Sequence, residues 1–172
     1  MNNKEENLKR AFDYLRKFYN EMAQLLSDVI NSMSNEGWDT VGDSGVVADV
    51  SYSLNSPDRW AVNMAYKTFI NSKLDDFTKG IYISFDDTVV DIPPCIILGK
   101  INVPAQEHEK WDMYYLVRKN IERIKSLPSE AFEASFIKGG NETTGLFFVI
   151  PLSEITSKKD LDQKVIARFI DL

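Results

Sequence analysis

The chain is short of two reactive residues, with a single cysteine and a single histidine. One thiol, Cys95, excludes an intramolecular disulfide and any zinc site built on two or more thiolates. Because Cys95 follows Pro93-Pro94 and opens an apolar run, we interpret it as a small buried hydrophobic residue. A Ser–His–Asp or Cys–His mechanism would have to use His108. That residue sits among charges at a predicted helix start, where a solvated histidine is expected.

Long apolar runs and an excess of positive charge are also missing. The longest apolar runs, residues 95–98 and 146–150, fall far short of the roughly 20 residues of a membrane helix. Residues 1–6 are polar and lack the apolar core of a secretory signal. The 20 basic and 26 acidic residues give a formal charge of −6, which offers no basic footprint for a phosphate backbone. We therefore expect a cytoplasmic protein that binds neither nucleic acid nor membrane directly.

What the chain does contain is enough material for one core. Its 172 residues are 44% hydrophobic and 12% aromatic. A domain of this length buries roughly 70% of the surface of its unfolded chain, so it needs no disulfide or structural metal to be stable. No repeat, low-complexity tract or linker divides the sequence. We predict a single domain over residues 1–172.

The clearest pattern is an apolar seam near the N-terminus. Its members recur in steps of four and three, which indicates an amphipathic helix: Leu8, Phe12, Leu15, Tyr19, Met22, Leu26, Val29 and Met33. Asn35-Glu36-Gly37 is a plausible stop. We expect Leu15, Phe18, Met22 and Leu26 to be buried against a sheet.

The length of this helix predicts a surface for a partner. Residues 4–34 would span roughly 46 Å, whereas a domain of this size has a diameter of roughly 40 Å. The helix would then overrun its own sheet by about one turn and carry Leu8 and Phe12 beyond it. These two residues are the candidate partner-binding residues. The alternative is a kink near Ser27 or Asn31 that folds the helix back onto the sheet.

The rest of the chain alternates between strand and helix patterns. Period-two alternation predicts strands at 45–54, 60–70, 80–85 and 94–103, and a hairpin of 131–138 with 145–150. Residues 60–70 also fit a helix capped by Ser56 with Pro57 at its first position, although β-branched and aromatic residues favour a strand. Helices are expected at 109–127 and after Ser157, where Ser157-Lys158-Lys159-Asp160 resembles a capping signal with Asp in place of the usual Glu or Gln. The predicted fold is α+β: a mostly antiparallel sheet of about five to six strands, covered by a long N-terminal helix, a middle helix and a C-terminal helix.

Two motifs for phosphate or metal chemistry are incomplete. Gly140 and Gly145 have phosphate-loop spacing, but Leu146 and Phe147 follow where Lys and Ser or Thr are required, so we interpret the segment as a hairpin tip. Carboxylates that a magnesium ion would need occur at Asp49 and Asp58.

The order of helix, strands, helix and strand, with Pro57-Asp58, is similar to the core of the PD-(D/E)xK nucleases. That resemblance implies a metal-dependent nuclease with an acid and a lysine two residues apart on the next strand. Here Ala65 stands two residues before Lys67, and Asp76 stands three before Lys79. The sequence departs from the motif at the acid that would hold the metal.

These observations favour a non-enzymatic module that binds a protein partner, or a second copy of itself, through the N-terminal helix. We expect it to serve as an accessory protein of a bacterial or phage cytosolic system, with no cofactor and no metal. Two alternatives stay open: a metal-dependent nuclease-like domain, in intact or degenerate form, that uses Asp49 or Asp58, and an acidic decoy that occupies a nucleic-acid-binding groove.

Overall fold

The chain begins with a single long helix, α1 (Asn3–Asn35), which has no break at Ser27 or Asn31. The computed structural model describes residues 3–42, 47–48, 62, 64–85, 92–104, 106–107, 109, 112–138 and 140–172. α1 ends as its sequence predicts: Gly37 adopts a φ of 81°, and the N–H of Trp38 donates to the carbonyl of Met33 at 3.0 Å. This Schellman-type cap also buries Trp38 beside Met33.

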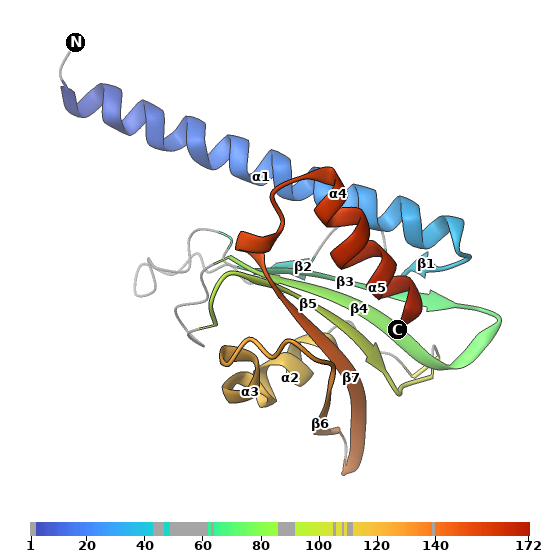
Figure 1. The fold of residues 1–172 in the computed structure, drawn as a ribbon. Coiled ribbons are helices and arrows are strands. Elements are labelled where there is room, and N and C mark those ends of the chain that lie inside the picture. Colours follow the sequence, from blue (N-terminus) through green and yellow to red (C-terminus); the bar gives the residue numbers. More distant parts are fainter. Residues whose placement is uncertain are drawn as a thin grey trace.

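One antiparallel sheet forms the centre of the fold (Figure 1). Its order is β1-β3-β4-β5-β7-β6, and β2 also pairs with β3, so the sheet is six strands wide. The bounds of the strands are β1 (Asp39–Thr40), β2 (Val47–Ala48), β3 (Met64–Asn71), β4 (Leu74–Ser84), β5 (Cys95–Ile101), β6 (Phe132–Lys138) and β7 (Asn141–Pro151). The predicted α+β class and the covering helices are confirmed.

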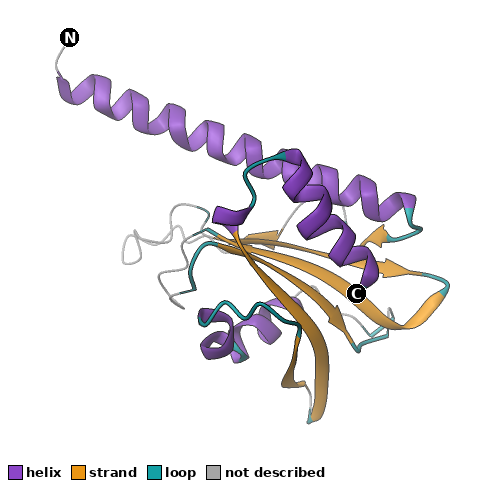
Figure 2. Ribbon diagram, viewed as in Figure 1, coloured by secondary structure: helices purple, strands orange, loops and turns teal. Residues whose placement is uncertain are grey.

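Helices cover both faces of this sheet (Figure 2). α1 and the C-terminal helices lie on one face, whose core includes Leu26, Val29, Ile81 and Phe169. α2 (Asp112–Lys119) and α3 (Ile121–Lys125) lie on the other. The period-two alternation of β3, β4, β5 and β7 separates these two cores, because successive side chains of a strand point to opposite faces.

Several predicted boundaries are wrong, each for a local reason. Residues 64–71 form the strand β3, so the helix alternative fails there, but β4 begins at Leu74 rather than at residue 80. The turn between them is closed by Asn71, whose side chain accepts from the N–H of Lys73 at 2.9 Å. β7 begins at Asn141 rather than Gly145, with Gly140 at a φ of 89° in the connection. Most of the predicted strand at 45–54, outside residues 47–48, lies beyond the described residues.

The middle and C-terminal helices are also less regular than expected. Asn120 separates α2 from α3, and its side chain donates to the carbonyls of Leu116 and Ser135. After a short 3-10 turn, η2 (Leu152–Glu154), the chain ends in three helical pieces: α4 (Lys158–Asp160), the π-helical η3 (Leu161–Ile166) and α5 (Ala167–Asp171). Ser157 caps α4 as predicted, with its hydroxyl accepting from the N–H of Asp160 at 3.1 Å.

Two glycines allow the close packing of the α2 face. A Cβ on Gly80 would lie 3.0 Å from Sδ of Met113 in α2, and a Cβ on Gly99 would lie 2.5 Å from Cε1 of Phe147. Gly80 and Gly99 are register partners in β4 and β5. The missing side chains therefore make room for Met113 and for the ring of Phe147.

Candidate partner-binding site

The N-terminal half of α1 extends past the sheet without a described element beneath it (Figure 1). We call residues 4–17 the projecting segment. Every residue in it except the partly exposed Glu6 is exposed. Fourteen residues of helix correspond to about 21 Å, so the overrun is several times the single turn that the sequence predicts.

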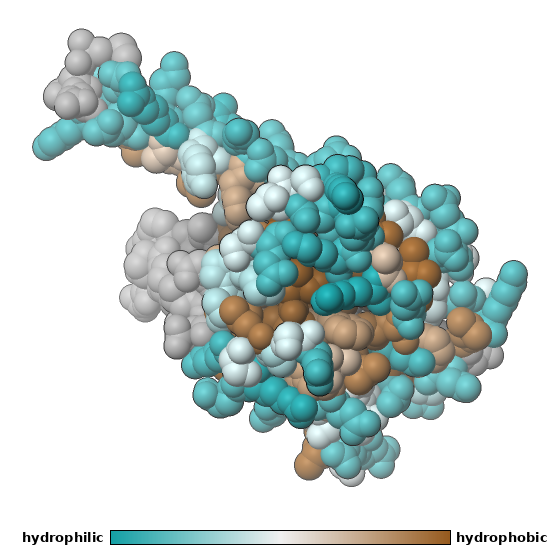
Figure 3. Space-filling model, viewed as in Figure 1, coloured by the Kyte–Doolittle hydropathy of each residue, from teal (hydrophilic) through white to brown (hydrophobic). Residues whose placement is uncertain are grey.

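Large apolar side chains are exposed along the projecting segment. Leu8 is 61% exposed, Phe12 56%, Tyr14 72% and Leu15 41%. Figure 3 shows hydrophobic surface along the underside of this helix, leading toward the body. Our prediction that Leu15 is buried is wrong, and Phe18 is only partly buried, whereas Met22 and Leu26 are buried as expected. The apolar seam therefore runs from open surface into the core without interruption.

The helix meets the body at Phe18 and Tyr19. The ring of Phe18 packs edge-on against Phe85, with centroids 5.1 Å apart. The Tyr19 hydroxyl accepts from the N–H of Val62 at 3.1 Å and donates to the carbonyl of the same residue at 3.4 Å. These contacts fix where the projecting segment leaves the sheet.

An ion pair fastens the other half of α1 to the C-terminal helices. Nζ of Lys158 lies 2.7 Å from Oδ2 of Asp28. The hydrogen bond between them lowers the pKa of Asp28 and raises the pKa of Lys158. α1 is thus held along its C-terminal half while its N-terminal half projects.

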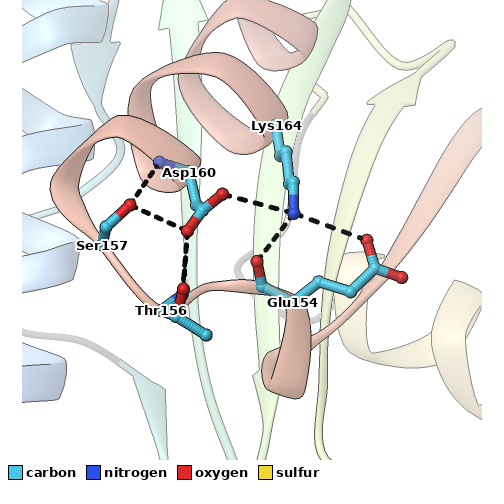
Figure 4. A network of polar contacts seen from close by, with 5 residues as sticks. All are labelled: Glu154, Thr156, Ser157, Asp160 and Lys164. Atoms are coloured by element: carbon cyan, nitrogen blue, oxygen red, sulfur yellow. Dashed lines mark hydrogen bonds and ion pairs between the residues drawn. The ribbon is translucent and has the colours of Figure 1, made fainter.

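The polar network that begins at Ser157 stabilises this attachment (Figure 4). Asp160 accepts hydrogen bonds from the hydroxyls of Ser157 (2.8 Å) and Thr156 (2.9 Å), and these bonds hold its pKa below the usual value. Lys164 lies 3.3 Å from Oδ1 of Asp160 and donates to the carbonyl of Glu154 at 2.8 Å. The network orders the start of α4, which carries Lys158 to α1.

Charged side chains surround the seam of the projecting segment. Arg10 pairs with Glu6, and Nη2 of Arg16 lies 2.7 Å from Oδ1 of Asp13. Lys9 makes no ion pair with any described residue. These exposed ion pairs contribute only about 0–1 kcal/mol each to stability, so they do not prevent Arg10 and Arg16 from pairing with acidic side chains of a partner.

No protein-family model, curated protein or solved structure matches this chain. None of the described helices is long and apolar enough to cross a membrane. Within the described ranges, no three His, Cys, Asp or Glu side chains form a group that could hold a metal ion.

Among the described residues, those that the sequence singled out for chemistry do not form one site. Cys95 is buried in β5, and burial raises its pKa to about 12, as expected for a core thiol. Ala65 and Lys67 are both buried in β3. Asp76 is exposed, whereas Lys79 is buried. Asp49, Asp58 and His108, which carry the nuclease and histidine hypotheses, lie outside the described residues.

The outer edge of the sheet is a second surface that partners commonly use. β6 is the edge strand beyond β7, and an open edge invites an added strand. Here Asn120 donates to the carbonyl of Ser135 and Arg123 donates to the carbonyl of Glu133, each at 3.2 Å. Because these side chains already occupy two carbonyls of the edge, the projecting segment is the better candidate. The sequence could not identify β6 as the edge strand, since no local pattern shows which strand lies at the edge of a sheet.

Proposed function

We propose that this protein is a non-enzymatic interaction module that binds another protein through the projecting segment of α1. The observation that carries the proposal is the exposure of Leu8, Phe12 and Leu15 on a helix whose remaining seam is core. Contiguous exposed apolar surface is a recurring property of protein-binding sites. An amphipathic helix that offers residues at i, i+4 and i+7 is a familiar recognition element.

The way α1 is anchored supports the same proposal. The axis of α1 is held in place by three features: the buried half of the helix, the Lys158–Asp28 ion pair and the hydrogen bonds between Tyr19 and Val62. A binding element that is already helical and oriented loses little conformational entropy on association. As proposed, the module acts in the cytosol as an accessory protein of a bacterial or phage system, without cofactor.

Site-specific crosslinking in the cells that produce the protein tests this function. A photoreactive residue is introduced at position 8, and separately at position 17, which is half a helical turn away in angle from Leu8. Position 8 should give one dominant protein adduct, position 17 should give none, and Phe12→Glu should abolish the adduct at position 8. Circular dichroism checks that each variant folds. Equal crosslinking at both positions, or no adduct at position 8, would contradict the proposal.

A further inference from the structure

We propose that the partner presents an acidic amphipathic helix, which lies along the projecting segment. Its apolar side chains would pack on Leu8, Phe12 and Leu15, and its carboxylates would pair with Lys9 and Arg16. This inference rests on the proposed function and identifies the chemistry of the partner. Three features of the segment support it: its flanking charges, its net charge and the direction in which its seam faces.

Bases line one flank of the exposed seam. Lys9 and Arg16 each follow a seam residue, Leu8 and Leu15, and are seven residues apart, so they lie two turns apart along the same side of the helix. Two acids share this flank: Glu5, one turn before Lys9, and Asp13, one turn after Lys9 and paired with Arg16. The Asp13 carboxylate uses only part of the Arg16 guanidinium, which has five N–H donors and is 73% exposed at the side chain. Both bases are therefore available to carboxylates of a neighbouring helix.

The net charge of the segment differs in sign from that of the whole chain. Residues 4–17 hold five basic and three acidic side chains, a net charge of +2. The complete chain carries −6, so the remainder carries −8. A basic helix on an acidic body attracts an acidic segment locally, and the body disfavours strongly acidic partners at other surfaces.

The same charges oppose association of two copies. In an antiparallel pair of projecting segments, Lys9 of one copy faces Arg16 of the other, and in a parallel pair Lys4 faces Lys9. Like charges that face each other across an interface are destabilising. The three exposed apolar side chains of the seam, Leu8, Phe12 and Leu15, present on the order of 300 Å², less than half of the roughly 800 Å² that each partner buries in a typical stable interface. Charge pairs on the flank must therefore assist binding.

The direction of the seam disfavours a flat surface such as a bilayer. Leu8, Phe12 and Leu15 lie on the same side of α1 as Met22 and Leu26, which pack on the sheet. A plane that touched the projecting seam would collide with the body, as the arrangement in Figure 1 makes clear. A helix of about 10–12 Å diameter is narrow enough to follow the seam along the projecting segment alone.

Two synthetic peptides of three heptads test the inference. Both have leucine at the a and d positions; one has glutamate at the flanking e and g positions and the other has lysine. Fluorescence anisotropy at physiological salt measures their affinity for the full chain. The acidic peptide should bind at least tenfold more tightly than the basic one. Lys9→Glu/Arg16→Glu should reverse this preference, and Leu8→Glu/Phe12→Glu should abolish binding of both peptides.

Lys17→Glu is the matched control, since it reverses a charge on the side of the helix opposite the seam. It should leave the preference unchanged. Equal affinity for the two peptides, or a preference that Lys9→Glu/Arg16→Glu does not alter, would overturn the acidic-helix inference while crosslinking at position 8 still supported an interaction module. A position-8 adduct that proves to be a second copy, or Leu8-dependent binding to anionic vesicles without peptide binding, would also overturn it. If neither peptide binds and position 8 gives no adduct, the proposed function fails as well.

Discussion

The ammonium of Lys79 in β4 donates a 2.8 Å hydrogen bond to the carbonyl of Phe169 in the last helix. It donates a second to the carbonyl of Ile170 at 2.7 Å and lies 4.8 Å from the ring centroid of Trp38. The carbonyls at the end of a helix lack partners within the helix, and a lysine placed there satisfies them and complements the helix dipole. Lys79 thus connects the sheet to the C-terminal helices that hold α1.

Replacement of Lys79 by methionine should weaken this connection. The variant keeps an apolar stem but leaves two carbonyls without their charged donor, so we expect a loss of about 1–3 kcal/mol in the free energy of unfolding. Urea denaturation measures it. Lys73→Met, at an exposed turn, should change stability by no more than about 0.5 kcal/mol. A Lys79→Met protein as stable as the parent would show that the cost of burying the ammonium cancels its hydrogen bonds.

The titration of Lys79 predicts how this stability varies with pH. Burial, together with the charge of Lys100, lowers the pKa of Lys79 from 10.5 to about 8. Between these values the unfolded chain holds a proton that the folded protein has released, so the contribution of Lys79 to stability rises with pH. The difference in unfolding free energy between the parent and Lys79→Met should therefore increase from pH 8 to pH 9.5. A difference that stays constant, or that decreases, would contradict the lowered pKa.

The close approach of Phe147 to Gly99 predicts that a single methyl group is costly. Gly99→Ala would place a Cβ 2.5 Å from Cε1 of Phe147, and the overpacking should cost about 1–3 kcal/mol. Calorimetry or urea denaturation measures the loss. Phe147→Leu in the same chain should recover part of it, because the shorter side chain vacates the contact. If the losses of stability from Gly99→Ala and Phe147→Leu simply add in the double variant, the contact between these two residues is excluded as the cause.

The two halves of α1 should respond differently to the same substitution. Leu26→Ala should cost about 2–5 kcal/mol because the side chain is buried in the core. Leu8→Ala, at a side chain that is 61% exposed, should change stability by less than about 0.5 kcal/mol. Chemical denaturation of the two variants measures both. A large loss at Leu8 would mean that the projecting segment packs on its own body.

The sequence predicts the fold class and α1 well because their patterns are long. The seam from Leu8 to Met33, the cap at Gly37 and the capping residue Ser157 are all local signals, and each is confirmed. The projecting segment is harder to delimit, since periodicity identifies the apolar side of a helix but not where the sheet beneath it ends. For that reason the sequence wrongly predicts Leu15 in the core.

The missed elements depend on contacts that are distant in sequence. Leu74 and the charged residues after it look like a loop, yet β4 begins at Leu74, which pairs with Asn71 of β3. β1 consists of Asp39–Thr40 and exists only through pairing with β3. The break at Asn120 arises because its side chain bonds to β6 as well as to its own helix.

Thiol protection at position 8 tests the central claim most directly, namely that the projecting seam is an open site for an acidic helix. Cys95 is buried with a raised pKa, so it should not react, and Leu8→Cys provides a single accessible thiol. The rate of its modification should approach that of a free thiol in the isolated protein and fall at least tenfold with saturating acidic peptide. The thiol of Lys17→Cys should react at the same rate with and without peptide. A Leu8→Cys thiol that is already protected in the isolated monomer, or that the peptide leaves equally reactive, would contradict the account.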